Sequence, residues 1–300
     1  MQPPANILHI ILLLQPMQNF DQQLIHLIDE ALKEDIGSGD YSTLSCISKD
    51  KKGKAVLKIK QDGILAGVDV AKKIFEMADP GALFIKLKHD GEVMRSGEIA
   101  FTVETSDYTI LTRERLVLNC MQRMSGIATL TRKYVEKLKG YHTRVLDTRK
   151  TTPNFRLLEK EAVRIGGGTN HRFGLYDMIM LKDNHIDYCG GLEFAINKAW
   201  DYVQVNRLDL KIEVETRTIA DVEKVCTMGT GKVFRVMLDN FSPEDVALAV
   251  KIIEGKFETE ASGGINLDTI ENYAKTNVDY VSVGGLIHQA QSLDLSLKAV

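Results

Sequence analysis

The stretch "KIEVETRTIADVEKVCTMGTGKVFRVMLD", residues 211–239, decides the fold because it begins and ends with a short apolar strand and has a helix-like segment between them. The same alternation continues along the chain from residue 144 onward. Strands that alternate with helices in this way form parallel sheets with right-handed crossovers. The expected strands are 144–148, 178–182, 211–216, 234–239, 257–262 and 279–284. A closed barrel of this kind needs roughly eight strands, so the sequence predicts an incomplete barrel or further strands that this pattern does not show.

The region before residue 144 predicts a separate α/β unit. Apolar groups at helical spacing in residues 20–35 indicate an amphipathic helix. Residues 108–139 also have a helical pattern, which we expect to break into two helices near Ser125 and Gly126. Alternating residues typical of antiparallel strands lie at 54–60, 82–88 and 98–105.

Composition and charge narrow the classes of protein. The 300 residues are 44% apolar, which is enough for ordinary buried cores and about two domains. With 38 Lys and Arg against 41 Asp and Glu, no global positive field favours a nucleic acid. The apolar run 7–14 is well short of the roughly 20 residues that a membrane span needs. We therefore expect a soluble protein with neither a nucleic-acid nor a membrane partner.

Cysteine usage and the N-terminus bear on location. The four cysteines are widely spaced and include no C-x-x-C pair: Cys46, Cys120, Cys189 and Cys226. This pattern is typical of free thiols in a reducing compartment and favours a cytoplasmic protein. Residues 1–16 have neither the leading basic residue nor the cleavage site of a secretory signal. We interpret them as an N-terminal extension that could be non-native, with Met17 as an alternative start.

Polar residues and glycines stand at the C-terminal end of every expected barrel strand. In chain order they are Asp147 to Lys150, Lys182, Glu215, Asp239, Ser262 to Gly264, and Gly284 with Gly285. In a (β/α) barrel these ends form the mouth of the active site, and the last two βα loops often bind phosphate. The pattern therefore predicts a polar site at the mouth of the barrel.

Four cations near this mouth predict a pocket for a small molecule with several negative charges. Arg149 and Arg172 have planar guanidinium groups suited to carboxylate or phosphate, and Lys150 and Lys182 supply compact charges. They lie at loops or strand ends rather than on helix faces, which favours ligand binding over ordinary surface charge.

Neighbouring residues have structural explanations that compete with functional ones. Arg156 and Arg164 lie on the next expected helix, and we interpret them as solvated surface charges. Residues 166–168, three glycines, could bring the backbone close to a ligand or make a tight turn. His185 is explained as well by structure as by function, and an isolated histidine such as His171 is more often structural.

The segments "SGGI" (262–265) and "VGGL" (283–286) each place glycines between a strand and an expected helix. This arrangement aims backbone N–H groups and a helix N-terminus at an anion. Either segment alone is unremarkable, but two in consecutive loops predict a phosphate site. Its members are Ser262, Gly263, Gly264, Gly284 and Gly285.

Glu215 and Asp239 end neighbouring strands of the expected barrel. Hard carboxylates at this place suit Mg²⁺ held through water together with a phosphorylated substrate, or hydrogen bonds to sugar hydroxyls. The alternative is a salt bridge at the strand end to Arg217 or Arg235. Together with the cations and the glycine loops, the carboxylates are typical of a phosphoribosyl site.

Nine blocks of the sequence resemble the quinolinate phosphoribosyltransferase family, whose members are also called carboxylating nicotinate-nucleotide pyrophosphorylases. The blocks run in the family's order from about Phe20 to the C-terminus. They are "EDIGSGDYST" (34–43), "ERLVLNCMQRMSGIATLT" (114–131), "DTRKTTPNFRLLEKEAV" (147–163), "GGGTNHRFGLYD" (166–177), "LKDNH" (181–185), "EVET" (213–216), "LDNFSPE" (238–244), "EASGGI" (260–265) and "DYVSVGG" (279–285). Asn154 departs from the family's usual glycine, but asparagine tolerates left-handed geometry, so we expect the loop to keep its shape.

The resemblance implies an N-terminal α/β sandwich domain and a C-terminal open, incomplete α/β barrel. The expected ranges are 17–126 for the sandwich domain and 127–290 for the barrel, with residues 291–300 packing back on the N-terminal domain. The resemblance also implies a homodimer with shared active sites, in which each N-terminal domain covers its neighbour's barrel mouth. Such dimers could assemble further into hexamers.

The resemblance also implies a reaction and roles for the site residues. Quinolinate and phosphoribosyl pyrophosphate would give nicotinate mononucleotide, carbon dioxide and pyrophosphate, with Mg²⁺, in de novo NAD synthesis. Quinolinate would be bound by Arg149, His171, Arg172 and Lys182, with Arg115 of the partner subunit. Lys150 would lie near the pyrophosphate, Glu215 and Asp239 near the ribose and metal, and Ser262, Gly263, Gly264 and Gly284 around the 5′-phosphate. The expected catalytic residues are Lys150, Glu215 and Asp239.

Other functions share parts of this pattern. Nicotinate phosphoribosyltransferase shares the fold but handles a monocarboxylate, for which so many cations would not be needed. A barrel lyase could use Lys150 or Lys182 to form a Schiff base beside the same phosphate loops. The chain could also be an inactive ligand-binding paralogue, or belong to a related branch associated with molybdenum transport.

Overall fold

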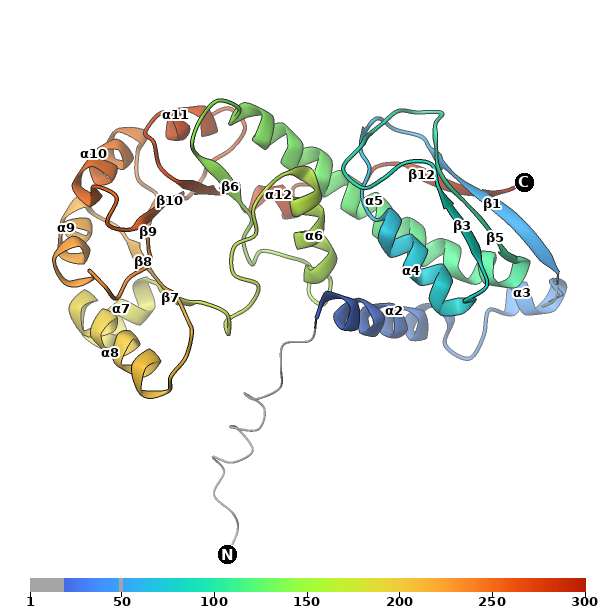
Figure 1. The fold of residues 1–300 in the computed structure, drawn as a ribbon, viewed down its shortest axis with the longest axis horizontal. Coiled ribbons are helices and arrows are strands. Elements are labelled where there is room, and N and C mark those ends of the chain that lie inside the picture. The colour runs from blue at the N-terminus through green and yellow to red at the C-terminus, as the bar shows by residue number, and fades with distance from the viewer. Residues whose placement is uncertain (1–18, 49–50) are drawn as a thin grey trace, which may run out of the picture.

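Two sheets of opposite kind organise the chain, one antiparallel and one parallel, as the sequence predicts. The computed structural model describes residues 19–48 and 51–300, so the predicted extension 1–16 lies outside the described residues. The antiparallel sheet belongs to the body on the right of Figure 1, and the parallel sheet to the body on the left. Among the helices of the described residues, none combines the length and the apolar character that crossing a membrane requires.

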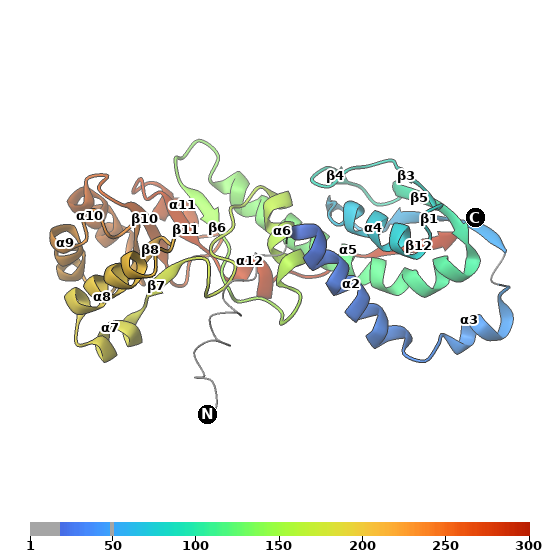
Figure 2. The ribbon, with the colours of Figure 1, turned by 60° about the horizontal axis from the view of Figure 1, so that its bottom comes forward.

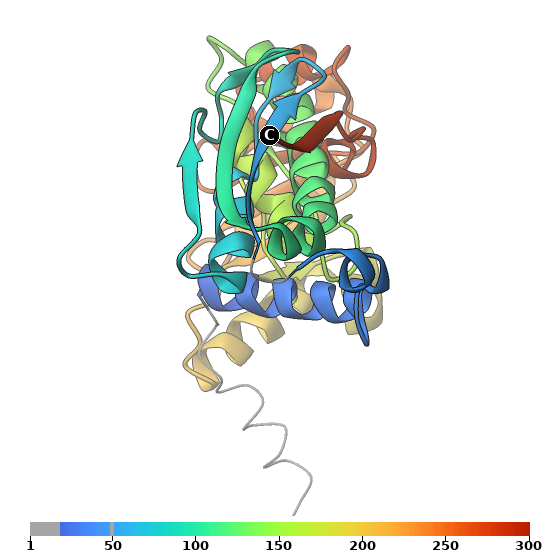
Figure 3. The same ribbon diagram turned by 90° about the vertical axis from the view of Figure 1, so that its right-hand side faces the viewer.

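The antiparallel sheet has the strand order β12-β1-β5-β3. The strands are β1 (Lys52–Ile59), β3 (Leu83–Lys86), β5 (Ile99–Ser106) and β12 (Leu295–Ala299). Helices α4 (Val68–Ala78) and α5 (Asp107–Lys137) pack against one face of this sheet, as Figure 3 shows end-on. The three strands predicted by alternation are therefore confirmed, and the last strand of the chain, β12, pairs with β1.

Smaller elements complete this body. They are α2 (Phe20–Ile36), α3 (Tyr41–Cys46) and a short antiparallel pair of β2 (Gly63–Ile64) and β4 (Val93–Met94). The predicted amphipathic helix is α2, which begins with a capping box between Asn19 and Gln22. Helix α2 buries Leu24 and Ile28, and it contacts α5 and the later helix α6 (Arg156–Gly166).

Helix α5 is continuous, so the predicted break near Ser125 and Gly126 is wrong. The Ser125 hydroxyl remains on the helix and exchanges hydrogen bonds with the backbone N–H and carbonyl of Ala66, at 3.0 and 3.2 Å. Gly126 is required by packing, because a Cβ at this position would lie 2.0 Å from the backbone oxygen of Gln291. The small residues therefore mark a close approach of other segments to the helix.

The parallel sheet has the strand order β6-β11-β10-β9-β8-β7, which confirms the predicted strands. The strands are β6 (Arg144–Leu146), β7 (Ile179–Leu181), β8 (Ile212–Thr216), β9 (Arg235–Asp239), β10 (Glu258–Ser262) and β11 (Tyr280–Ser282). The helices that follow them are α6 (Arg156–Gly166), α7 (Asp183–Cys189), α8 (Leu192–Val205), α9 (Ile219–Met228), α10 (Pro243–Ile253), α11 (Ile270–Ala274) and α12 (Gly285–His288). The first strand, β6, pairs with the last, β11, but not with β7, so the barrel is open (Figures 1 and 2).

The two faces of the parallel sheet differ in polarity. Val214, Val236 and Leu238 are fully buried and belong to the core that the outer helices cover. Because side chains alternate along a strand, Glu213 and Glu215 point to the opposite face, inside the open barrel. The inner face of this barrel is therefore lined with charged side chains.

Candidate active site

The ends of β9 and β10 bring Asp239 and Ser262 together. The two residues are register partners, and the Ser262 hydroxyl donates to Asp239 Oδ1 at 2.5 Å. Asn240 Nδ2 donates to the other carboxylate oxygen at 2.7 Å. The two oxygens of Asp239 are therefore oriented by neighbouring side chains, and their remaining lone pairs are available for a ligand at the mouth of the barrel.

Lys182 and Glu215 form a second pair at the same mouth. The Nζ atom of Lys182 lies 2.7 Å from Glu215 Oε2. The Lys182 side chain is 46% exposed whereas that of Glu215 is only 7% exposed, so the ammonium group lies on the open side of the carboxylate. Both residues thus belong to one polar surface.

The predicted alternative of strand-end salt bridges to Arg217 or Arg235 is wrong for both carboxylates. Arg217 pairs with Asp187 at 3.1 Å. Arg235 lies deeper in the barrel and pairs with Glu258 at 2.7 Å and Glu260 at 3.0 Å.

Arg149 and Arg172 lie close enough to repel one another. Burial lowers the pKa of Arg172, and the charge of Arg149 lowers it further. The Arg172 Nη1 atom donates to the Met178 carbonyl at 3.1 Å, and Arg149 is exposed. Among residues 19–48 and 51–300, neither guanidinium forms an ion pair with a carboxylate. Glu213 and Asp177 act on Arg172 without forming an ion pair with it, so the two neighbouring cations define a place for a negatively charged ligand.

The loop that carries Arg149 and Lys150 is anchored from within. The fully buried Glu159 accepts hydrogen bonds from the N–H and hydroxyl of Thr152, at 2.8 and 3.0 Å. Arg123 on α5 pairs with the same carboxylate at 2.8 Å. This network fixes the loop against α5, and Asn154 in the same loop has the left-handed φ of 61° that its sequence position predicts.

Lys150 lies beside the glycine loop that follows β11. A Cβ built on Gly284 would lie 3.0 Å from Lys150 Cδ and 3.5 Å from His288 Nε2. The backbone N–H groups of Gly263, Gly264 and Gly284 donate no hydrogen bond to any described residue. Free N–H groups with a lysine beside them are the components of a phosphate site.

The loop after β10 differs from the predicted strand–glycine–helix unit. Gly263 and Gly264 have positive φ values of 96° and 63°, but α11 begins only at Ile270. A Cβ on Gly263 would lie 2.1 Å from Asn240 Oδ1, so glycine is required where these two loops meet. The free N–H groups of this loop, rather than a helix terminus, are what an anion could meet.

His171 is held inside the barrel by residues of several strands. Its Nε2 atom lies 3.0 Å from Glu213 Oε2 and 3.2 Å from Glu260 Oε2. Burial lowers the pKa of His171, but hydrogen bonding and the charges of the two glutamates outweigh burial and raise the pKa to about 9. However, His171 Nδ1 accepts the backbone N–H of Arg172 at 2.6 Å, and a second ring proton would displace this contact. The contact geometry therefore places the ring proton on Nε2.

The pKa values of the two glutamates in this cluster shift in opposite directions. Burial and the nearby Glu260 raise the pKa of Glu213 to about 7. For Glu260, the neighbouring His171 and Arg235 outweigh burial and lower the pKa. Glu260 is therefore the more firmly ionised member of the pair.

Several residues of this region have structural roles. A Cβ on Gly166 would lie 2.7 Å from the Ala128 carbonyl, and one on Gly168 would lie 2.9 Å from Thr131 Cγ2, so these glycines allow the α6 region to pack against α5 rather than approach a ligand. His185 Nδ1 accepts the Lys182 N–H at 3.0 Å at the start of α7.

Arg156 is not the solvated surface charge that its helical position predicts. It donates to the Thr151 hydroxyl and to the Phe173 carbonyl, both at 2.9 Å, and ties the two loops of the mouth together. Arg164 does lie on the surface, where it pairs with Glu161.

Residue-by-residue reasoning missed four residues of the mouth and its floor. They are Glu213, Asn240, Glu260 and His288. The two glutamates had a signal in the sequence, because charges at every second position of a buried strand point to one polar face. Asn240 and His288 had none, since their approach to the glycine loops depends on the fold.

These features define a class of protein: a barrel enzyme that binds a phosphorylated sugar together with an anionic second substrate. The chain belongs to the quinolinate phosphoribosyltransferase family. The N-terminal domain of the family matches residues 40–125, and its C-terminal domain matches residues 127–298.

Individual relatives agree with this assignment. Quinolinate phosphoribosyltransferase [decarboxylating] 1b of Nicotiana tabacum is 42% identical over 90% of this chain and 81% of its own length. A probable nicotinate-nucleotide pyrophosphorylase [carboxylating] of Bacillus subtilis is 41% identical over 92% of this chain and 93% of its own. The crystal structure of NadC from Streptococcus pyogenes superposes with a TM-score of 0.85 at 40% identity, covering 95% of this chain and 99% of that one. These relatives favour the phosphoribosyltransferase over the lyase among the functions that the sequence leaves open.

Proposed function

We propose that the protein transfers the phosphoribosyl group of phosphoribosyl pyrophosphate to quinolinate and releases carbon dioxide and pyrophosphate, giving nicotinate mononucleotide for NAD synthesis. Membership of the family supports this activity. The observation that carries it in this chain is the pair of arginines, Arg149 and Arg172, which lie close together and form no ion pair with a carboxylate among the described residues. Quinolinate has two neighbouring carboxylates, and guanidinium forks bind such groups tightly.

The phosphoribosyl half of the site lies at the other side of the mouth. We assign the 5′-phosphate to Ser262, Gly263, Gly264, Gly284 and Gly285, because the N–H groups of Gly263, Gly264 and Gly284 have no partner among the described residues. Lys150, which reaches across Gly284, would stabilise the leaving pyrophosphate. Glu215 and Asp239 would stabilise the positive charge that develops at the ribose C1 as pyrophosphate departs.

The pyridine nitrogen then attacks C1 and becomes quaternised. The ring can now accept the electron pair released when the bond to the adjacent carboxylate breaks, and carbon dioxide leaves as a proton takes its place. Transfer of this carboxylate from water into a preorganised site favours its loss. In this chain Arg149, Arg172, Lys182 and the buried His171 would provide that site.

The donor atoms at the mouth fit Mg²⁺, which the family resemblance implies. Glu215 and Asp239 offer hard carboxylate oxygens on neighbouring strand ends. Both already accept hydrogen bonds, from Lys182 and from Ser262 with Asn240, so we infer that they would hold the ion through water. The ion would neutralise the pyrophosphate that it accompanies.

We further propose a homodimer in which Arg115 of the partner subunit completes the quinolinate pocket. Arg115 is exposed on the N-terminal part of α5, and it has no hydrogen bond or ion pair with any described residue. This part of α5 lies beside α3, at the end of the molecule away from the parallel sheet (Figure 1). The side chain therefore cannot reach its own barrel mouth, but a two-fold partner could receive it.

The activity is tested by following carbon dioxide and nicotinate mononucleotide formed from quinolinate and phosphoribosyl pyrophosphate, with and without Mg²⁺. We expect equal amounts of both products and dependence on the ion. Nicotinate in place of quinolinate is the control, because its single carboxylate leaves part of the cationic pocket unpaired. Preference for nicotinate, or no turnover of either acid, would contradict the proposal.

For location we propose the cytoplasm, on the ground that the four cysteines are free thiols. Cell fractionation checks this proposal, and recovery of the protein in an organelle or in an oxidising compartment would reject it.

A further inference from the structure

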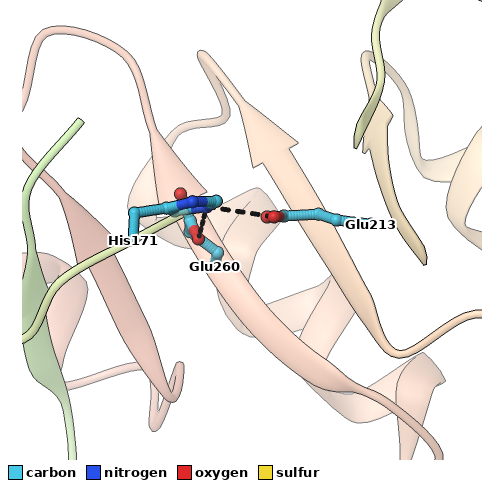
Figure 4. A group of neighbouring side chains, drawn as sticks. All are labelled: His171, Glu213 and Glu260. Carbon is cyan, nitrogen blue, oxygen red and sulfur yellow. Dashed lines mark ion pairs between the residues drawn. The ribbon is translucent and has the colours of Figure 1, made fainter. Parts of the chain in front are cut away.

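A buried cluster of His171, Glu213 and Glu260 lies inside the barrel below the quinolinate pocket. Figure 4 shows the imidazole of His171 between the carboxylates of Glu213, from β8, and Glu260, from β10. Both glutamates are fully buried, and His171 is 8% exposed. In the described part of the chain His171 Nε2, both Glu213 oxygens and Glu260 Oε1 have no hydrogen bond of good geometry, so the ring meets the two carboxylates through close polar contacts at 3.0 and 3.2 Å. Burial of two carboxylates lowers the stability of the protein, so their presence calls for a role that explains them.

The three side chains have donor atoms within 4.8 Å of one another, as a metal site would. Two contacts indicate that a proton, rather than a metal ion, lies between these three side chains. Arg235 already places a guanidinium nitrogen 3.0 Å from Glu260 Oε2. His171 Nδ1 accepts the Arg172 N–H, so a ring that also gave its Nε2 lone pair to a metal would have no proton at all. The ring proton therefore lies on Nε2, between the two carboxylates.

The backbone on both sides of His171 is fixed as well. Its N–H donates to Asp147 Oδ1 at 2.8 Å, and its carbonyl accepts from Lys160 at 3.0 Å. Asp147 and Lys160 form a buried ion pair of their own. With the backbone fixed, only the side-chain rotation of His171 is still free. This rotation decides whether Nδ1 accepts the N–H of Arg172.

We propose that Glu213 and Glu260 are positioning residues: they hold the Nε2 proton of His171 so that Nδ1 fixes the backbone of Arg172, and thereby aim the Arg172 guanidinium at the dicarboxylate. This inference rests on the proposed function for the identity of the ligand. The placement of the imidazole can be measured without any substrate. This role requires an acceptor oxygen at both positions, 213 and 260, whether it belongs to a carboxylate or to an amide. An apolar side chain of similar size at either position does not hold the proton.

The test compares Glu213→Leu with Glu213→Gln, which keeps an acceptor oxygen. We expect Glu213→Leu to raise the dissociation constant and KM for quinolinate about tenfold or more. The KM for phosphoribosyl pyrophosphate should change less than about twofold, and Glu213→Gln should recover most of the quinolinate affinity. Equal losses for both substrates, or unchanged quinolinate affinity in Glu213→Leu, would overturn the proposal.

Glu258→Gln is the matched control. Glu258 pairs with Arg235 as Glu260 does, but His171 makes no contact with it. The quinolinate constants of this variant should match those of the wild type. A loss as large as that of Glu213→Leu would mean that the charge of the barrel floor, rather than the hold on His171, sets the affinity.

Nitrogen NMR of the imidazole in the free, unmutated protein separates this inference from the proposed function. We expect His171, identified by its absence in His171→Asn, to show an unprotonated Nδ1 and a protonated Nε2. Failure of the protein to turn over quinolinate would reject the proposed function and leave this result standing. A proton on Nδ1, whether or not Nε2 also has one, would reject the positioning role even if the enzyme is active.

Discussion

Lys150 passes directly over Gly284, so that a Cβ at position 284 would lie 3.0 Å from the Lys150 Cδ atom. Gly284 has an ordinary right-handed φ of −61°, and the backbone therefore does not require glycine there. What the missing side chain provides is room for the lysine, which joins the loop after β6 to the loop after β11. Two segments far apart in the sequence thus form one surface, to which we assign the binding of phosphate.

Gly284→Ala should displace Lys150 without harming the fold, because a flexible side chain can move away. Loss of one charged contact predicts a rise of about tenfold in the KM for phosphoribosyl pyrophosphate. Quinolinate affinity should be nearly unchanged. Gly81→Ala is the control, since Gly81 lies in the turn before β3, outside the barrel, and its Cβ would meet only the side chain of Asp79. Steady-state kinetics of the two variants settle the point, and equal effects would show that Lys150 is not involved.

Arg149→Ala should weaken quinolinate binding while the binding of phosphoribosyl pyrophosphate largely persists. Hydrogen bonds to charged groups contribute about 1.5–3 kcal/mol, which corresponds to roughly 10- to 150-fold in affinity. Calorimetry with each substrate measures the two effects separately. Arg164→Ala is the control, because Arg164 lies on the surface and pairs with Glu161. If both substrates lose affinity equally, Arg149 has a role other than the one assigned.

Glu159→Gln should destabilise the protein, because it leaves Arg123 without its buried partner. Removal of one member of a buried pair costs about 3 kcal/mol or more. The loop of Arg149 and Lys150 would also lose its anchor at Thr152, so the affinities for both substrates should fall together. Urea unfolding measures the first effect. The control is Glu161→Gln, because Glu161 pairs with Arg164 at the surface. This variant should change the free energy of unfolding by less than about 1 kcal/mol.

The parallel strands could be predicted because each is a short apolar run followed by a helical pattern, and the mouth followed from the ends of those strands. The continuity of α5 through Ser125 and Gly126 could not be predicted in the same way. Glycine at position 126 has the same local signal whether a helix ends or a distant backbone, here that of Gln291, packs against it. Local sequence records the cost of glycine in a helix but not the contact that requires it.

The glycines at 166–168 and the charged floor illustrate the same limit. Close approach of α6 to α5 explains Gly166 and Gly168, and this approach depends on how two helices cross. For the floor, the contact of His171 with Glu213 and Glu260 joins a loop to two strands that are not sequence neighbours. Sequence predicted which residues lie at the mouth, whereas their pairings required the register of the sheet.

Asp279 predicts a stability change in acid. Its carboxylate accepts two hydrogen bonds from Thr259 and lies 2.8 Å from His142 Nε2. Burial alone would raise its pKa, but His142 and Thr259 outweigh burial and lower it. A carboxyl group whose pKa is lower when folded stabilises the protein above the unfolded-state pKa, and this contribution is lost as the pH falls through the folded-state pKa.

The free energy of unfolding should therefore fall below about pH 4, and Asp279→Asn should flatten this decline while lowering stability at pH 6. Urea unfolding at several pH values measures both effects. Asp209→Asn is the control, because Asp209 is exposed and has no hydrogen bond or ion pair with any described residue. An unchanged acid decline in Asp279→Asn would show that other groups cause it.

The proposed shared site makes a prediction about mixtures of two impaired variants. Arg115→Ala removes the arginine that a subunit would place in its partner's site. Arg149→Ala damages the quinolinate pocket of the subunit's own barrel. In a mixed dimer one of the two sites would combine an intact barrel with an intact Arg115 of the partner subunit. If the subunits of an equal mixture exchange at random, about a quarter of all sites become intact, so about a quarter of the wild-type activity should return. Activity measured after unfolding and refolding the two variants together checks this. Separately refolded samples mixed afterwards are the control, and activity equal to theirs would place Arg115 in its own subunit's site or in none.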